Sequence, residues 1–236
     1  MALTLFWTAA ALGIGANDYI FPNGPTTFEN VGSPSYGAGG AIIGAAGALF
    51  DANEQSRIND HLCLDPAEGA IGVWFNATAN GSFLWSQGAS WTENIGIAVN
   101  LGTGAVAFRT KADATGDSQI VTADSVVSTG TDYFAVARWR AVTNERELAV
   151  YDIDMNLIGS ASSGSSWTLP TGLGSRLVFG STDGNWAGKV DSVFVSTSFD
   201  EPIEAYAKIA NYAQYGESFT GLPSTMSLYY RTLGMT

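Results

Sequence analysis

The chain has 236 residues, of which 46% are hydrophobic, and a net charge of −12 at neutral pH. This length suits one large all-β domain or two small domains, and we expect one because no long charged or Pro-rich linker interrupts the chain. The net charge and the small number of Lys and Arg residues, ten without a cluster, argue against binding to nucleic acid and to an anionic membrane. A single Cys rules out an internal disulfide framework.

The first residues, MALTLFWTAAALGIGA (1–16), are apolar. A signal peptide cleaved near Ala9 to Ala11 is one interpretation, but the first basic residue of the chain is Arg57, so the basic start of a signal peptide is missing. The stretch is also too short to span a bilayer. We therefore expect a first β-strand here, followed by a Gly/Pro-rich loop region up to residue 40.

Short runs rich in Val, Ile, Phe, Trp and Thr recur along the chain, separated by Gly, Asn, Asp and Ser. Many short strands without helical stretches between them predict an antiparallel sandwich or barrel. In YFAVARWRA (133–141), alternation places Tyr133 and Trp139 on one face and Arg138 and Arg140 on the other. The expected strands are 70–75, 82–87, 95–101, 105–111, 118–123, 133–141, 147–154, 176–181 and 189–196.

A helical pattern comes late. Ser198 lies three residues before Glu201, which suits a capping box, Pro202 fits the first turn, and Gly216 can end the helix in a left-handed cap. The tail after it has apolar side chains that we expect to dock on a neighbouring subunit, namely Phe219, Leu228, Tyr229 and Tyr230. The expected organisation is a sandwich over 1–197 (with 1–40 as first strand and loop region), a helix over 198–216 and a tail over 217–236.

Four segments have a suggestive order. GALFDAN (47–53) ends a strand in Phe-Asp, and GAIGVWFNATANGSFLWS (69–86) is a Trp-bearing strand followed by a hairpin. RELAVYDIDMNLIGS (146–160) and RLVFGSTDGNWAGKVDSVFVS (176–196) are strands with tight turns. Over about 41–197 the chain resembles the laminin-G-like, concanavalin-A-like jelly-roll family, which implies an antiparallel jelly-roll β-sandwich. It departs from that family where Asp-Ile-Asp replaces the usual Val-Asp-Gly turn.

The acidic segment 147–154 raises the question of catalysis. Glycosidases of this fold carry Glu-x-Asp-x-x-Glu on one strand, which brings an acid and a nucleophile into the cleft. Glu147 has no acid two residues later, and Asp152 and Asp154 fall at the end of the strand and in the turn. Asp is a common turn residue because its side chain bonds the local backbone. We expect a hairpin turn here, and a protein that is not an enzyme.

Other catalytic patterns are weak. One histidine, His61, excludes a multi-histidine metal site. His61 and Cys63 share a face of an expected strand, so a Cys-His pair is conceivable, but a packed Cys beside a partly exposed His is the expected arrangement. GAGGAIIGAAG (37–47) matches neither the dinucleotide nor the P-loop spacing, and we interpret it as a flexible approach to a strand.

The family resemblance implies a structural calcium ion, held by the Asp of the closing strand and by carbonyl groups of earlier loops. On that basis Asp191 is the leading ligand, with Asp51 and Asp18 as weaker candidates. The alternative is that Asp191 accepts hydrogen bonds from neighbouring backbone amides. Apart from this possible calcium ion, we expect no cofactor.

A lectin of this fold needs an exposed aromatic platform beside polar loop groups. Trp91 and Trp167 lie in loop-like contexts and are the candidates, whereas Trp186 matches a family position that packs inward. The alternative for each is packing in the core or between subunits, because aromatic residues also dominate interfaces.

Small jelly rolls of this kind occur in bacteriophage virions, whose Lys-poor composition rich in Gly, Ala, Ser and Thr resembles that of this chain. This step is an analogy from fold. The first expectation is a non-catalytic structural protein of a virion, such as a capsid-decoration, head-fibre or tail protein. It would be assembled in the host cytoplasm as a homo-oligomer or with other virion proteins. The alternative is a calcium-assisted, lectin-like module that binds carbohydrate on a cell or virion surface, outside the cell.

Overall fold

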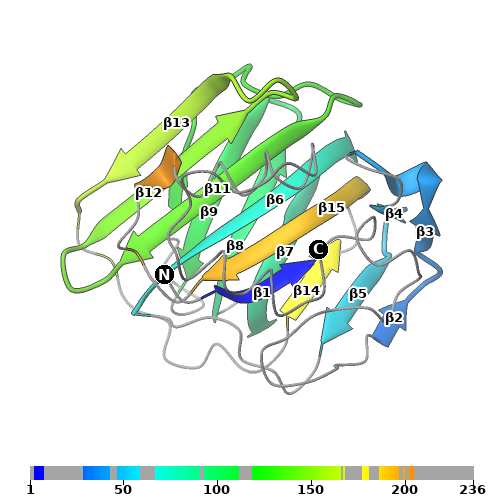
Figure 1. The fold of residues 1–236 in the computed structure, drawn as a ribbon, viewed down its shortest axis with the longest axis horizontal. Helices are drawn as coiled ribbons and strands as arrows, with labels where there is room; N and C mark the ends of the chain where they lie inside the picture. Colours follow the sequence, from blue (N-terminus) through cyan, green and yellow to red (C-terminus); the bar gives the residue numbers. More distant parts are fainter. Residues whose placement is uncertain are drawn as a thin grey trace, which may run out of the picture.

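The computed structural model describes residues 3–7, 29–42, 47–58, 67–90, 93–111, 119–165, 167, 177–180, 186–196, 199 and 202–204. Within these residues the protein is two antiparallel β-sheets packed face to face (Figure 1), which confirms the predicted all-β sandwich. The helical residues of the described part are the 3-10 turn η1 (Ala38–Gly40) and residues 203–204. Most of the predicted helix 198–216 and all of the predicted tail lie outside the described residues.

The eight-stranded sheet lies in front in Figure 1. Its described strands are β1 (Leu3–Trp7), β3 (Ser35–Gly37), β4 (Gly47–Phe50), β6 (Glu68–Ala79), β11 (Tyr133–Arg140), β12 (Glu145–Tyr151), β13 (Leu157–Ser163) and β15 (Ala187–Ser196). They are ordered β13-β12-β11-β6-β15-β4-β3, and β1 pairs with β15 in addition. The long strands β6 and β15 therefore form the centre of this sheet.

The seven-stranded sheet lies behind it in Figure 1. Its described strands are β2 (Glu29–Val31), β5 (Gln55–Ile58), β7 (Gly81–Ser90), β8 (Glu93–Asn100), β9 (Ala105–Lys111), β10 (Gln119–Val121) and β14 (Leu177–Gly180). They are ordered β10-β9-β8-β7-β14-β5-β2. The chain passes from β13 in the eight-stranded sheet to β14 in the seven-stranded sheet, where β14 lies between β7 and β5. Such crossings between two sheets occur in a double-sheet jelly roll.

The core lies between the inner faces of the two sheets. Strand β11 shows how alternation builds it, because Tyr133 and Trp139 point into the core while Arg138 and Arg140 lie on the opposite face, as predicted. The Trp139 ring packs 5.6 Å from the Phe108 ring of the seven-stranded sheet, measured between centroids. Aromatic pairs of this kind add to the apolar area that holds the sheets together.

The outer face of the eight-stranded sheet carries a second apolar layer. Trp74, Phe134 and Tyr151 are neighbours across β6, β11 and β12, and their ring centroids are 5.4 Å and 6.4 Å apart. All three are buried although they face away from the core. Phe199 and Ile203, which are also buried, come from the segment that follows β15. We call residues 199–204 the strap, and its described part lies over β12 in Figure 1.

The structure describes the Gly-rich segment 37–47 at its two ends, residues 37–42 and 47, and the flexibility expected of it stays a prediction. Gly40 packs directly on the backbone of Gly47 and Ala48 at the start of β4, so closely that a Cβ at either glycine would overlap backbone atoms. Glycine is the residue that permits such an approach of two backbones. The contact lies next to the β3–β4 pair, in which Gly37 is opposite Gly47.

Candidate functional site

A hollow of about 810 Å³ lies on the outer face of β8, β9 and β10 in the seven-stranded sheet. Alternation turns the large residues of these strands inward, among them Ile97, Val106 and Phe108, which belong to the core. The floor that remains outside consists of small residues: Ala98, Ala105 and Ala107. A hollow forms here because neighbouring strands present short side chains at adjacent positions.

The register of the strands brings the floor residues together. Ala98 of β8 is directly opposite Ala107 of β9, and Ala105 is opposite Asn100 two pairs further along. On the other side of β9, Val121 of β10 is opposite Ala107. Val121 is 45% exposed and forms an apolar side of the hollow. The hollow therefore has an apolar base onto which a flat, partly apolar ligand such as a sugar ring can stack.

One end of the hollow is built on the turn between β8 and β9. The side-chain oxygens of Asn80 and Asn100 both accept a hydrogen bond from the Gly102 N–H, at 3.0 Å and 2.9 Å. Asn100 also accepts from the Thr103 N–H at 3.3 Å. Because these oxygens are used by the turn, each amide presents its NH₂ group, which is a donor. Gly104 completes the turn with a φ of 72°, which favours glycine.

A second loop closes the same end. Its backbone N–H groups bind the β8–β9 turn, from Ser125 to the Thr103 carbonyl at 2.8 Å and from Val126 and Val127 to the Gly104 carbonyl at 2.9 Å. These bonds fix the neighbouring Asp124, which is exposed and lines the hollow. Asp124 is thus held in place by the backbone around it.

The other end of the hollow carries Arg109 and Gln119, which are directly opposite each other on β9 and β10. On the β8 side, Arg109 is opposite Gly96, which has no side chain to fill the space. The hollow therefore combines an apolar floor with amides, a hydroxyl, a guanidinium and one carboxylate at its margin. Few convergent polar groups around an apolar base are typical of small-ligand sites.

The acidic segment 147–154 forms a hairpin turn, as predicted. Asp152 Oδ1 accepts hydrogen bonds from the backbone N–H groups of Asp154 at 3.0 Å and Asn156 at 2.8 Å. The Asn156 Nδ2 donates to Asp152 Oδ2 at 2.9 Å, and this bond is the main reason that the pKa of Asp152 is lowered. Met155 adopts a φ of 62°, the left-handed conformation that closes the turn. Asp152 therefore acts as the anchor of a turn.

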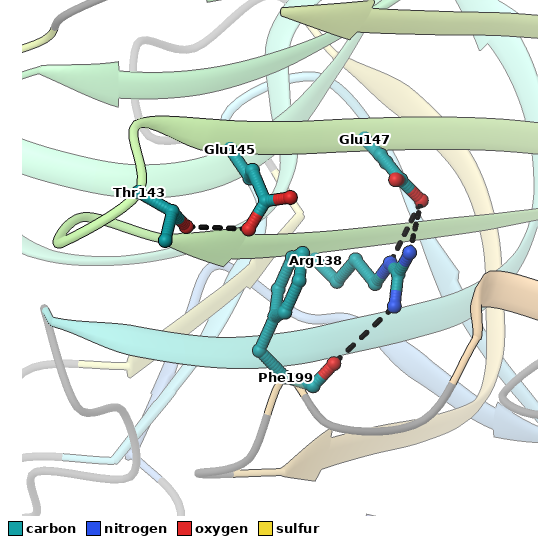
Figure 2. Close-up of polar contacts among 5 residues, drawn as sticks. All are labelled: Arg138, Thr143, Glu145, Glu147 and Phe199. Carbon is teal, nitrogen blue, oxygen red and sulfur yellow. Dashed lines mark hydrogen bonds and ion pairs between the residues drawn. The ribbon is translucent and has the colours of Figure 1, made fainter. Parts of the chain in front are cut away.

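Glu147 is held in an ion pair. Figure 2 shows the guanidinium of Arg138 between the Glu147 carboxylate and the backbone carbonyl of Phe199. The Nε and Nη2 atoms of Arg138 are each 2.7 Å from Glu147 Oε2, and Nη1 is 3.2 Å from the Phe199 oxygen. The guanidinium carbons of Arg138 and Arg140 lie 4.3 Å and 4.7 Å from the centre of the Phe199 ring. This arrangement fastens the strap to β11.

The predicted calcium ligands are placed apart. Asp191 is fully buried on β15, and its Oδ2 accepts a hydrogen bond from the Ile42 N–H at 3.1 Å. Nearby, Lys189 Nζ donates to the Ala41 carbonyl at 3.3 Å. Asp51 is exposed and follows the end of β4. In the register of the β4–β15 pair, Asp51 lies more than three residues from the position opposite Asp191. Asp18 lies outside the described residues. Within the described part, no three acids, His or Cys gather as a metal-binding group.

Of the two predicted aromatic platforms, the structure describes Trp167. Trp91 lies outside the described residues. Trp167 is partly buried, packs on the core, and has the Arg146 guanidinium carbon 5.5 Å from its ring centre. Arg146 bonds Thr110 of the opposite sheet at 3.1 Å, and burial lowers the pKa of Arg146. Trp186 is fully buried in the core, as predicted.

The remaining candidate residues are beyond the described ranges. The predicted subunit contacts Phe219, Leu228, Tyr229 and Tyr230 belong to this group, as do His61 and Cys63. No helix within the described residues is long and apolar enough to cross a membrane. The hollow itself was missed by the sequence interpretation, although alanines alternating with large residues at 105–108 were a signal that could have indicated its floor.

No protein-family model and no curated protein matches the sequence. Solved structures do share the fold. Domain 4 of an extracellular GH43 arabinanase from Geobacillus stearothermophilus, in complex with arabinotriose, has a TM-score of 0.62 at 11% identity, over 84% of this chain and 93% of that one. The binding domain of botulinum neurotoxin DC, in complex with SialylT, has a TM-score of 0.62 at 10% identity, over 91% of this chain and 52% of that one.

A phage protein is also similar. The enzymatically active domain of tailspike protein 2 from bacteriophage CBA120 has a TM-score of 0.55 at 15% identity, over 80% of this chain and 30% of that one. This chain thus spans about half of the neurotoxin domain and less than a third of the tailspike domain. At such identities the likeness shows the fold alone: the protein is an antiparallel β-sandwich of the type found in these three domains.

Proposed function

We propose that this protein is a non-catalytic module that binds a glycan in the hollow on β8, β9 and β10. The observation that carries the proposal is the hollow itself, an apolar alanine floor of β8 and β9 surrounded by amide, hydroxyl, guanidinium and carboxylate groups. Sugars present apolar ring faces and many hydroxyls, so they fit this combination. The arabinotriose complex of the similar arabinanase domain supports it by analogy.

The proposal that the protein binds a glycan without catalysis rests on the number and the partners of its described carboxylates. Hydrolysis of a glycosidic bond by the common mechanisms needs two carboxyl groups that flank the bond. Among the described residues that line the hollow, Asp124 is the one carboxylate. On the other sheet, Glu147 is engaged with Arg138, and Asp152 with its own turn.

The direct test fills the floor of the hollow. We expect Ala107→Trp to abolish binding to glycans identified on a glycan array, measured by titration calorimetry, because an indole would occupy the space of the ligand. Val142→Trp is the matched control, since Val142 is 86% exposed in the β11–β12 turn of the other sheet and is outside the residues that line the hollow. Equal binding by wild type and Ala107→Trp would show that the hollow is not the site.

A second candidate is a structural role in a bacteriophage virion, as a capsid-decoration, head-fibre or tail protein. The likeness to a phage tailspike domain and the Lys-poor composition favour it. The protein would then form a homo-oligomer or bind other virion proteins, and the glycan module would place it on a virion or extracellular surface. Light scattering on the full chain and on a version ending at Gly216 tests this, and a monomer in both cases would argue against self-assembly through the tail.

The structural calcium ion stays part of this proposal. Asp191 is the ligand we propose, and its carboxylate already orders residue 42 by a hydrogen bond. A thermal melt with calcium and with a chelator measures the effect. A melting temperature that is the same in both would argue against the ion.

A further inference from the structure

The hollow differs in charge from the protein around it. The chain has a net charge of −12. The side chains that line the hollow include one cation, Arg109, and one acid, Asp124. Among the described residues that line the hollow these two charges balance, whereas the whole chain has an excess of acids, so an anionic ligand meets less repulsion from these residues than from a surface of average charge.

The cation and the acid lie at opposite ends. Asp124 is held beside Gly104 by the loop hydrogen bonds, whereas Arg109 lies five residues further along β9. At about 3.4 Å per residue this offset is roughly 17 Å along the strand. The hollow is therefore polar along its length, with the guanidinium at one end, and it is longer than a single sugar ring.

Among the described residues that line the hollow, side-chain hydrogen-bond donors outnumber free acceptors. The oxygens of Asn80 and Asn100 are occupied by the Gly102 N–H, so both residues offer NH₂ groups. The guanidinium of Arg109 has five N–H donors, enough to hold a carboxylate in a bidentate pair and to keep other contacts. Gln119, directly opposite Arg109, adds a further amide. A site rich in donors is matched by a ligand rich in acceptors.

From these features we infer that the hollow binds an acidic oligosaccharide, with a carboxylate of the glycan on Arg109 and Gln119 and its hydroxyls on the amides near Gly102. The inference rests on the proposed glycan-binding function and adds the class of glycan. The guanidinium fits because its planar fork matches a carboxylate, which a lysine or an amide does not. The alanine floor between the ends accommodates the sugar rings.

The experiment compares one glycan in two charge states. Calorimetry with the full chain measures binding of an oligogalacturonate and of its methyl ester, which has the same rings without the charges. We expect the acid to bind about tenfold more tightly than the ester, which is the effect of losing one charge-assisted hydrogen-bonded pair. We also expect the preference to shrink as salt rises from low to physiological ionic strength, because screening weakens an exposed ion pair.

Variants show which residue causes the preference for the acid. Arg109→Gln should remove the preference for the acid, so that the variant binds acid and ester with equal affinity. Arg57→Gln is the matched control, because it makes the same charge change on β5 of the same sheet, outside the residues that line the hollow. It should keep the preference. If Arg109→Gln fails to fold, the comparison of acid and ester on the wild-type protein still decides the inference.

The outcomes separate the two proposals. Equal affinity for acid and ester, with loss of both in Ala107→Trp, would overturn the acidic class and leave glycan binding in the hollow standing. An acid preference that survives Arg109→Gln would overturn the assignment to Arg109. Absence of binding to either compound and to an array of neutral and acidic glycans, or binding that Ala107→Trp does not change, would overturn the proposed function as well.

Discussion

The two sheets treat their outer faces in opposite ways. On the eight-stranded sheet, Trp74, Phe134 and Tyr151 form a buried aromatic layer, and the strap lies on the same face, with Phe199 and Ile203 also buried. On β8 and β9 of the seven-stranded sheet, the outward positions at the floor of the hollow are the alanines Ala98, Ala105 and Ala107, and nothing in the described part of the chain fills the space above them. Both faces are formed by β-strands, so the size of the outward side chains decides which face is covered and which face keeps a hollow.

This difference separates stability from binding. Large apolar residues on an outer face need a cover, and the cover then adds buried area to the fold. Small residues with polar neighbours leave a hollow that water or a ligand fills. Substitutions in the aromatic layer of the eight-stranded sheet should therefore change the free energy of unfolding, whereas substitutions of hollow residues that anchor no turn should change glycan affinity with little effect on stability.

The largest effect is expected from Phe134→Ala. Phe134 is fully buried and contacts the rings of Trp74 and Tyr151, so its removal leaves a cavity in the aromatic layer. We expect a loss of about 3–5 kcal/mol in the free energy of unfolding, measured by urea denaturation. Val121→Ala, at a position that is 45% exposed in the hollow, should cost less than about 0.5 kcal/mol. Similar losses for both variants would remove the distinction between the faces.

The strap is tested by Phe199→Ala. The ring is stacked against the guanidinium groups of Arg138 and Arg140 and is buried, so we expect a loss of about 2–3 kcal/mol. Hydrogen exchange of the β11 and β12 amides should also become faster, because the cover of their outer face is weakened. Pro202→Ala, at an exposed position of the same strap, is the control. Unchanged exchange in Phe199→Ala would mean that the strap is not needed as a cover.

Local chemistry explains which features could be predicted from the sequence. The strand alternation of β11 and the turn at Asp152 follow from residues close in the chain, and both were confirmed. The hollow depends on the register that places Ala98 opposite Ala107, and register between strands is set by the whole sheet. The position of Asp124 depends on backbone bonds from its loop to the β8–β9 turn, which no sequence pattern indicates.

A smaller effect distinguishes two hairpin turns, one on each sheet. Asp152 anchors the β12–β13 turn and Asn100 anchors the β8–β9 turn, each by accepting two backbone N–H bonds. We expect Asp152→Ala and Asn100→Ala each to cost about 1 kcal/mol of stability. Only Asn100→Ala should also weaken glycan binding, since Asn100 lines the hollow.

The pH dependence of the two turn variants should differ as well. The pKa of Asp152 is lowered in the folded protein, so its carboxylate stabilises the fold above the unfolded-state pKa near 4. That contribution is lost as the pH falls through the lower folded value. The difference in stability between wild type and Asp152→Ala should therefore shrink below about pH 4, whereas the difference for Asn100→Ala should stay constant. Urea denaturation at several pH values measures both, and Asp152→Asn, which keeps an acceptor oxygen without the charge, is the control.

The smallest effect concerns the pKa of Tyr151, which lies on β12 beside the end of the strap. Burial raises this pKa above 10, and the negative charge of Glu204 raises it further, because both disfavour the phenolate. In Glu204→Gln the pKa of Tyr151 should fall but stay above its ordinary value, since the burial remains. Absorbance titration measures this, with Tyr151→Phe identifying the signal among the nine tyrosines. Asp154→Asn removes the same charge from the adjacent turn and should leave the titration unchanged. A titration that does not respond to Glu204→Gln would place residue 204 away from β12, and the outer face of the eight-stranded sheet would then lack the cover that sets it apart from the hollow.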